Sequence, residues 1–176
     1  MRKQPPDIHF EKISLEQWRK DAARPIFGKP WEELTAEDQD QLDLFWYNIK
    51  LPSRSSAGSA GYDFFLPYPI EFNVGYRLIP TGIRWYTNRP MVLLIVPRSG
   101  LGFKHGTYLA NTIGVIDQDY YGSDNEGHIM AKMNAEDYFA LDGGKAFMQG
   151  IMVPYFITED DETTTTRNGG FGSSGA

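Results

Sequence analysis

The chain has 176 residues, of which 41% are hydrophobic and 14% aromatic, so it is the size of one domain that can bury a sizeable core. It has no cysteine and three scattered histidines, which excludes a disulfide framework and makes a structural zinc site unexpected. Its formal net charge of −6 argues against a nucleic-acid groove, because such grooves neutralise phosphates with an excess of Lys and Arg. No apolar run approaches the roughly eighteen residues of a membrane span, and no signal core follows the first residues, so we expect a cytoplasmic protein.

The first region, to about residue 49, predicts two helices. Ser14–Gln17 and Thr35–Asp38 both resemble capping boxes, in which a hydroxyl group accepts a hydrogen bond from a backbone N–H of the first helical turn. Leu42, Phe45 and Trp46 then recur at helical spacing. We therefore predict a helical insert at about residues 15–46.

The insert is rich in aromatic side chains, which have two interpretations. They could form an exposed face that docks onto a regulatory protein partner, or they could pack onto the domain, which is the simpler interpretation. Exposure of Trp18, Trp31 or Trp46 would favour the partner, and burial of all three would argue against it.

From about residue 51 to residue 158, short apolar runs alternate with Pro, Gly and Asn. Three runs predict strands: Tyr62–Leu66, Met91–Val96 and Gly150–Phe156. Closely spaced strands indicate a sandwich or a barrel, so the predicted fold class is all-β. From Glu159 to Ala176 the sequence passes from acidic residues through four threonines to a glycine-rich end. That composition cannot pack alone and predicts a flexible C-terminal arm when no ligand is bound.

Three segments of the strand region carry groups that suit a phosphate ester. Pro97–Gly102 follows a strongly apolar strand and combines a guanidinium, a hydroxyl and backbone N–H groups exposed by glycine. Asn111–Asp117 offers an amide able to read a base edge and, after an apolar pair, a carboxylate. Gly144–Gln149 ends in a glutamine that could bond phosphate, water or the backbone. Each segment also has a structural interpretation: a turn with a solvated arginine, an Asx cap, or a backbone contact.

The end of the chain, Arg167–Gly175, is rich in glycine but lacks the Gly-Lys-Ser/Thr ending of a P-loop, and no helix can follow it. It could close over a ligand held elsewhere, with its phenylalanine stacked on a base and its arginine and serines on phosphates. A tail without function is the alternative.

The order and spacing of these pieces resemble those of the trimeric deoxyuridine triphosphate nucleotidohydrolases (dUTPases) over roughly residues 49–176. The five family motifs stand as Ser59–Phe65, Pro97–Gly102, Asn111–Gly122, Gly144–Met152 and Arg167–Gly175. The resemblance implies a jelly-roll or β-barrel subunit, with residues 1–176 as a single domain, and a homotrimer whose active sites each draw residues from all three chains. It also implies hydrolysis of dUTP to dUMP and pyrophosphate, which limits uracil in DNA and supplies dUMP for thymidylate synthesis. Mg²⁺ would be held by the triphosphate and water rather than directly by the protein.

Site residues carry over from the resemblance motif by motif. In the third motif, Asp117 would orient and activate the attacking water, and Tyr120 would pack under the deoxyribose. Asn111 would read the uracil edge together with backbone groups of the hairpin at Gly114 and Ile116.

The resemblance assigns the phosphates to the second and fourth motifs and to the tail. The residues concerned are Arg98, Ser99, Gly100, Gln149, Arg167, Gly172, Ser173 and Ser174. Phe171 would cover the uracil. Asp63 of the first motif resembles the family aspartate that supports the phosphate and metal environment, and we assign it an indirect role.

The sequence departs from the common pattern at Ala146–Met148, where many members have a basic residue followed by Ile-Ala, and at Ser123–Glu126, which lengthens the turn after the hairpin. A dCTP deaminase on the same fold is the nearer alternative function. Those enzymes need a glutamate on the strand after the hairpin, where our alignment places Lys132, so the sequence argues against deamination.

Overall fold

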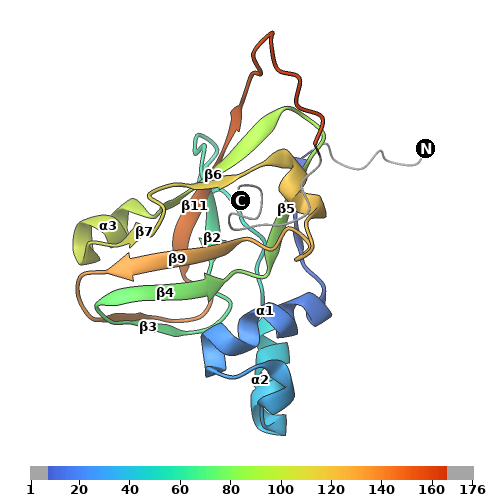
Figure 1. The fold of residues 1–176 in the computed structure, drawn as a ribbon. Helices are drawn as coiled ribbons and strands as arrows, with labels where there is room; N and C mark the ends of the chain where they lie inside the picture. Colours follow the sequence, from blue (N-terminus) through green and yellow to red (C-terminus); the bar gives the residue numbers. More distant parts are fainter. Residues whose placement is uncertain (1–7, 166–176) are drawn as a thin grey trace.

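The computed structural model describes residues 8–165, which fold mostly as β-sheet with a few helices (Figure 1). The strands are β1 (Ile8–Lys12), β2 (Tyr62–Phe65), β3 (Ile70–Phe72), β4 (Gly75–Pro80), β5 (Ile83–Thr87), β6 (Met91–Pro97), β7 (Tyr108–Leu109), β8 (Gly114–Ile116), β9 (Met130–Ala135), β10 (Phe139–Leu141) and β11 (Ala146–Pro154). The helices are α1 (Leu15–Phe27), α2 (Ala36–Tyr47) and α3 (Ser99–His105), with short 3-10 turns η1 (Trp31–Glu33) and η2 (Gln118–Gly122). The prediction of a mostly β fold is confirmed.

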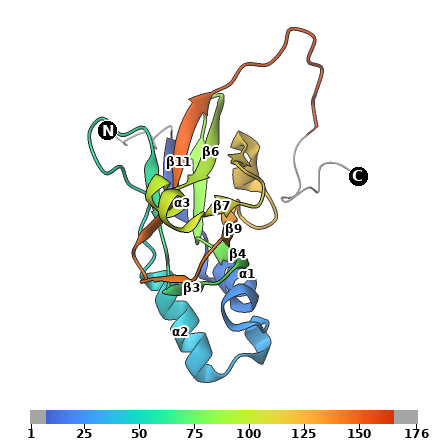
Figure 2. The same cartoon turned by 90° about the vertical axis from the view of Figure 1, so that its left-hand side faces the viewer.

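The strands form small antiparallel sheets. The largest has the order β2-β11-β6-β8, the next has the order β4-β9-β7, and β1 pairs with β5 and β10 with β3. Figures 1 and 2 show α1 and α2 together at one end of the β body, next to β3 and β4. Within residues 8–165, no helix has the length and apolar character needed to cross a membrane.

Helices α1 and α2 begin at the predicted capping residues. Ser14 Oγ accepts a hydrogen bond from the backbone N–H of Gln17 at 3.1 Å, and Thr35 Oγ1 accepts one from Asp38 at 3.2 Å. These bonds satisfy donors that the first turn of a helix otherwise leaves without a partner. Local sequence chemistry therefore sets where both helices start.

The aromatic side chains of the helical segment pack onto the domain. Trp18 is fully buried in the main core, and its Nε1 donates to the carbonyl oxygen of Leu42 at 2.9 Å. Trp46 donates to the carbonyl oxygen of Ile13 at 3.0 Å, and both Trp46 and Trp31 are half-buried against the core. The packing interpretation is thus confirmed for Trp18, and the three tryptophans do not form an exposed cluster.

The first two predicted strands closely match β2 and β6. The third was predicted from Gly150 to Phe156, and both of its limits were wrong because β11 begins at Ala146 and ends at Pro154. Gly150 lies inside the strand, where a Cβ would be 2.9 Å from Leu93 Cδ1 and 3.0 Å from the ring of Phe64. This glycine marks close packing between layers rather than the start of a strand.

Candidate active site

The segment of the third motif surrounds a hollow of about 450 Å³ beside β6, β8 and β9. Asn111, Gly114, Ile116 and Tyr120 all line it, together with apolar side chains such as Ile129. The structure therefore brings together the four residues that were expected to contact the nucleoside. The hollow combines apolar walls with an amide, which is typical of a site for a planar ring.

A tight turn places these residues. Thr112 has a left-handed backbone (φ 64°), and its N–H donates to the carbonyl oxygen of Leu109 at 2.9 Å. Such a conformation costs a residue other than glycine about 1–2 kcal/mol. Gly114 follows on β8 opposite Ile95, where a Cβ would lie only 3.0 Å from the Ile95 Cβ. A larger residue at Gly114 would push β8 away from β6 and change the shape of the hollow.

Tyr120 is buried at the inner side of this hollow. Its hydroxyl donates to the carbonyl oxygen of His128 at 2.9 Å and accepts from Asn125 Nδ2 at 2.9 Å. Ser123 Oγ donates to the carbonyl oxygen of Tyr120 at 2.7 Å. Hydrogen bonds at both ends of the residue thus fix the ring in one position.

Asp117 directly precedes η2, and its side chain makes no capping hydrogen bond to that turn. The interpretation of this aspartate as an Asx cap is therefore not supported. Asp117 is half-buried and lines an adjoining hollow of about 770 Å³ with Gln118, Tyr121 and Tyr155. Asp117 lines this second hollow, and its chain neighbour Ile116 lines the first.

The residues expected to bind phosphates form a second group, where β6 ends. Arg98 is the N-cap residue of α3, and its Nε lies 3.3 Å from a carboxylate oxygen of Asp63 on β2. Gln149 of β11 is the register partner of Asp63 and lies against Gly61, where a Cβ would overlap its side-chain oxygen. Asp63 therefore forms an ion pair with Arg98, and the indirect role expected for it stays a prediction.

Arg98 and Ser99 line a third hollow of about 330 Å³. Gly100 is exposed in α3 and Gln149 is half-buried in β11, and neither lines this hollow. No residue that lines it also lines the hollow around Tyr120. One chain thus places the residues expected to contact the nucleoside and the residues Arg98 and Ser99, expected to contact phosphate, in separate hollows.

Lys132 lines the Tyr120 hollow from β9, and its Nζ lies 5.2 Å from the centre of the Tyr76 ring. No Asp or Glu is among the described residues around this hollow.

The tail residues Arg167, Phe171, Gly172, Ser173 and Ser174 lie outside the described residues. Three residues that hold Tyr120 were not predicted from the sequence. Asn125 and His128 bond to the Tyr120 hydroxyl directly, and Asp21 acts through His128, from which its carboxylate accepts a hydrogen bond. No motif marks them, because Asp21 and His128 are 107 positions apart.

The fold is mostly β, and it gathers an amide, a tyrosine and apolar side chains around one hollow and an arginine and a serine around another. A family model described as dUTPase matches residues 47–175. Among curated relatives, the deoxyuridine 5′-triphosphate nucleotidohydrolase of Lactococcus lactis is 39% identical over 134 residues, covering 73% of this chain and 89% of that protein. The corresponding protein of Haemophilus influenzae is 38% identical over 136 residues, covering 71% of this chain and 87% of that one. The chain belongs to the dUTPase family.

Solved structures agree with this assignment. A crystal structure of dUTPase from Streptococcus mutans has 31% sequence identity and a TM-score of 0.61, covering 86% of this chain and 98% of that chain. A dUTPase from phage phi11 of S. aureus, in which a structural Mg(II) ion is coordinated, has 18% identity and a TM-score of 0.57, covering 69% of this chain and 94% of that chain. At that identity the second likeness concerns the fold alone. Residues 8–46, with α1 and α2, precede the stretch that the family model matches.

Proposed function

We propose that this protein hydrolyses dUTP to dUMP and pyrophosphate. The observation that carries the proposal is the hollow lined by Asn111, Gly114, Ile116 and Tyr120, with Asp117 next in the chain after Ile116 and lining another hollow. The amide of Asn111 suits the edge of uracil, and backbone groups at Gly114 and Ile116 complete its recognition. The phenol of Tyr120, held by hydrogen bonds to His128 and Asn125, packs under the deoxyribose and leaves no room for a 2′-hydroxyl.

In the proposed reaction, a water molecule attacks the α-phosphorus of dUTP, and the carboxylate of Asp117 accepts its proton. A bond forms between the water oxygen and the α-phosphorus, and the bond from that phosphorus to the oxygen bridging to the β-phosphate breaks. Pyrophosphate leaves with the electron pair of the broken bond. The guanidinium of Arg98, the hydroxyl of Ser99, the backbone at Gly100 and the amide of Gln149 bind the phosphate oxygens.

Mg²⁺ is the expected cofactor. Among residues 8–165, no group of three or more His, Asp or Glu side chains is placed to hold a metal ion, whereas Arg98 and Ser99 offer hydrogen-bond donors. This donor set fits a cation carried in on the phosphate oxygens and water rather than one held by the protein. Bound in that way, Mg²⁺ would supply neutralisation of the phosphate charge.

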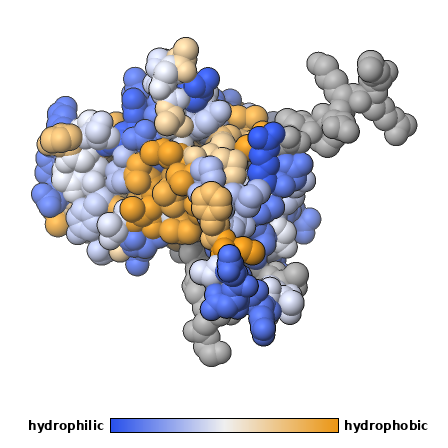
Figure 3. Space-filling model, turned by 90° about the horizontal axis from the view of Figure 1, so that it is seen from above, coloured by the Kyte–Doolittle hydropathy of each residue, from blue (hydrophilic) through white to orange (hydrophobic). Residues whose placement is uncertain are grey.

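A homotrimer with a jelly-roll subunit completes the proposal. One chain separates Arg98 from Tyr120 by placing them in different hollows, and a site assembled from neighbouring chains would join the two groups. Large exposed apolar side chains, including Tyr76, Tyr108 and Val115, lie on β4, β7 and β8. Figure 3 also shows apolar side chains gathered on the face seen from above. The tail residues Arg167, Phe171, Gly172, Ser173 and Ser174 would then close over the ligand, with Phe171 on the uracil.

The two other functions receive less support. Deamination of dCTP lacks a carboxylate at the base, because Lys132 stands at the expected position. A regulatory partner bound through residues 15–46 would need an exposed aromatic face there, but Trp18 is fully buried and Trp31 and Trp46 are half-buried.

The experiment that tests the proposal is a product assay on dUTP, dCTP, dTTP and UTP with Mg²⁺, in which pyrophosphate and ammonia are followed separately. Pyrophosphate from dUTP alone is the expected result. Ammonia from dCTP would show that the protein is a deaminase. No product from any of the four nucleotides would favour a binding protein.

A further inference from the structure

The hydroxyl of Tyr120 is held by the turn that follows η2. The carbonyl oxygen of His128 accepts from this hydroxyl at 2.9 Å, and Asn125 Nδ2 donates to it at 2.9 Å. The turn approaches Tyr120 closely, because a Cβ on Gly127 would lie 2.9 Å from the carbonyl oxygen of Tyr120. Any shift of this turn therefore shifts the phenol in the floor of the hollow.

His128, whose side chain is fully buried, holds this turn in place. The N–H of Gly82 donates to Nε2 of His128 at 2.9 Å, so Nε2 carries no proton. The proton is on Nδ1, which donates to a carboxylate oxygen of Asp21 at 2.7 Å. The imidazole is thus neutral, in one tautomer, and bonded at both nitrogens.

Asp21 lies on α1, before the stretch matched by the family model. A second contact joins the same two elements: Glu126 accepts from the backbone N–H of Ser14 at 2.7 Å and from its hydroxyl at 2.6 Å. Ser14 is the N-cap of α1, and Glu126 belongs to the lengthened turn. The two departures from the common family core, α1 and the lengthened turn, therefore contact each other directly.

We infer that Asp21 is a positioning residue for Tyr120, acting through His128, and so determines how strictly this enzyme prefers dUTP to UTP. The carboxylate fixes the imidazole, the imidazole fixes the turn, and the turn fixes the phenol against which the deoxyribose packs. Without Asp21, a buried Nδ1–H loses its acceptor, and the ring and its backbone move to regain one. This inference rests on the proposed function, because it takes the hollow as the deoxyribose site.

The test compares Asp21→Ala with Asp43→Ala. Asp43 forms an ion pair with Arg19 between α1 and α2, so its loss loosens the helices without touching His128. We expect Asp21→Ala to lower kcat/KM for dUTP about tenfold, mainly through KM, and to lower the ratio of kcat/KM for dUTP over UTP. Asp21→Asn restores most of both values, since the amide oxygen still accepts from Nδ1–H. Asp43→Ala keeps the wild-type ratio even if it unfolds at a lower temperature.

Asn125→Ala provides a second variant in case Asp21→Ala does not fold. It removes a hydrogen bond to the phenol and leaves the helices intact, and it lowers the same ratio. An unchanged dUTP/UTP ratio in Asp21→Ala, or equal effects of Asp21→Ala and Asp43→Ala, would show that α1 contributes stability only. An unchanged ratio in Asn125→Ala would show that the hydrogen bonds that hold the phenol do not set the preference, which overturns the inference. If the wild-type enzyme does not hydrolyse dUTP, the proposed function itself fails and removes this inference with it.

Discussion

The Nε atom of Arg98 lies 3.3 Å from a carboxylate oxygen of Asp63, which joins the start of α3 to β2. The Arg98 side chain is 45% exposed, so it stays available to a ligand while the carboxylate holds its orientation. We predict that Asp63→Asn raises KM for dUTP about three- to tenfold with little change in kcat, because the phosphate donor loses its support rather than its charge. Steady-state kinetics measure this effect.

Asp137→Asn is the matched control for that prediction. Asp137 accepts from His105 Nδ1 at 2.8 Å at the other end of α3, so its loss disturbs the same helix without touching Arg98. Equal effects of the two substitutions would mean that the Asp63–Arg98 pair only stabilises α3.

We predict that Asp117→Asn folds and assembles as the wild type but loses at least about a hundredfold in kcat, since an amide cannot take a proton from water. Asp119→Asn is the control, because Asp119 is an exposed aspartate that lines the same hollow. Pyrophosphate release from dUTP is the measurement. Activity near the wild-type level in Asp117→Asn would contradict the assignment of the proton acceptor.

Deletion of residues 167–176 tests the role of the tail. We expect kcat/KM for dUTP to fall at least about tenfold, the effect of losing about 1.4 kcal/mol of contact with the phosphates and base. Light scattering after size-exclusion chromatography should show the same assembly for both proteins. Loss of the assembly would instead make the tail structural, and Phe171→Ala then separates the contribution of the aromatic ring.

Local chemistry made part of this molecule predictable. Ser14 and Thr35 act on donors three positions away, so a capping pattern alone located the start of both helices. Gly150 was wrongly predicted to be the first residue of a strand. The need for a glycine at this position comes from close packing against Leu93 and Phe64 on neighbouring strands. Asp21 and His128 escaped notice for the same reason, since contacts made across the fold leave no periodic signal in the sequence. The grouping of Asn111, Gly114, Ile116 and Tyr120 could be predicted because these four residues belong to one short segment, and their contact with a nucleoside stays a prediction.

Fold stability should depend on Trp18 of α1. Its side chain is fully buried and bonded to the carbonyl oxygen of Leu42, so Trp18→Ala leaves a cavity and removes this hydrogen bond. We predict a loss of about 3–5 kcal/mol in the free energy of unfolding, measured by urea titration. Leu44→Ala is the control on α2, because Leu44 is 56% exposed and should cost little. A small loss for Trp18→Ala would mean that the helices contribute little to the core.

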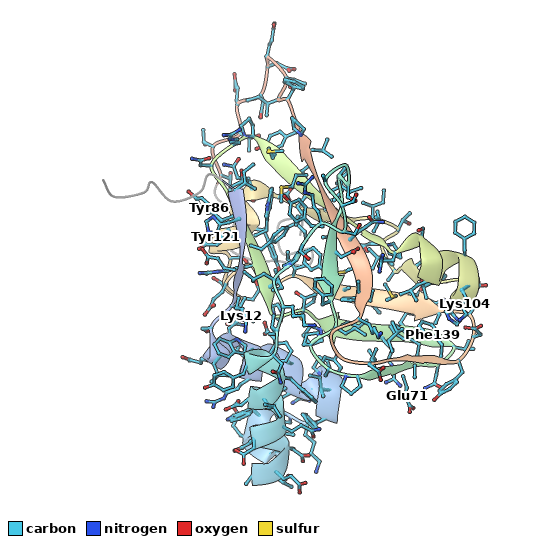
Figure 4. The ribbon with its side chains drawn as sticks, turned by 180° about the vertical axis from the view of Figure 1, so that it is seen from behind. Lys12, Glu71, Tyr86, Lys104, Tyr121 and Phe139 are labelled. Atoms are coloured by element: carbon cyan, nitrogen blue, oxygen red, sulfur yellow. The ribbon has the colours of Figure 1, made fainter. Side chains whose placement is uncertain are left out.

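A pH dependence of stability should arise at Glu11 of β1. Burial disfavours the charge of Glu11, but hydrogen bonds from His9, Arg84 and Tyr121 and the charge of Arg84 outweigh it and hold the pKa of Glu11 below its ordinary value. In Figure 4, Tyr121 lies beside Tyr86, and their ring centres are 5.2 Å apart, which fixes the phenol that donates to Glu11.

Because the folded pKa of Glu11 is lowered, its contribution to stability is fully present above the unfolded pKa of about 4.3 and is lost as the pH falls through the folded pKa. We therefore predict that Glu11→Gln is less stable than the wild type at pH 7, by about 1 kcal/mol or less because the side chain is 33% exposed. The difference should narrow below about pH 4 as the wild-type carboxylate becomes protonated. Glu71→Gln, an exposed glutamate far from Tyr121 in Figure 4, should follow the wild type at every pH. Thermal unfolding between pH 7 and pH 3 measures the stability of both variants and of the wild type. A difference in stability between Glu11→Gln and the wild type that stays constant with pH would show that the charge of Glu11 does not stabilise the contact between β1, β5 and η2.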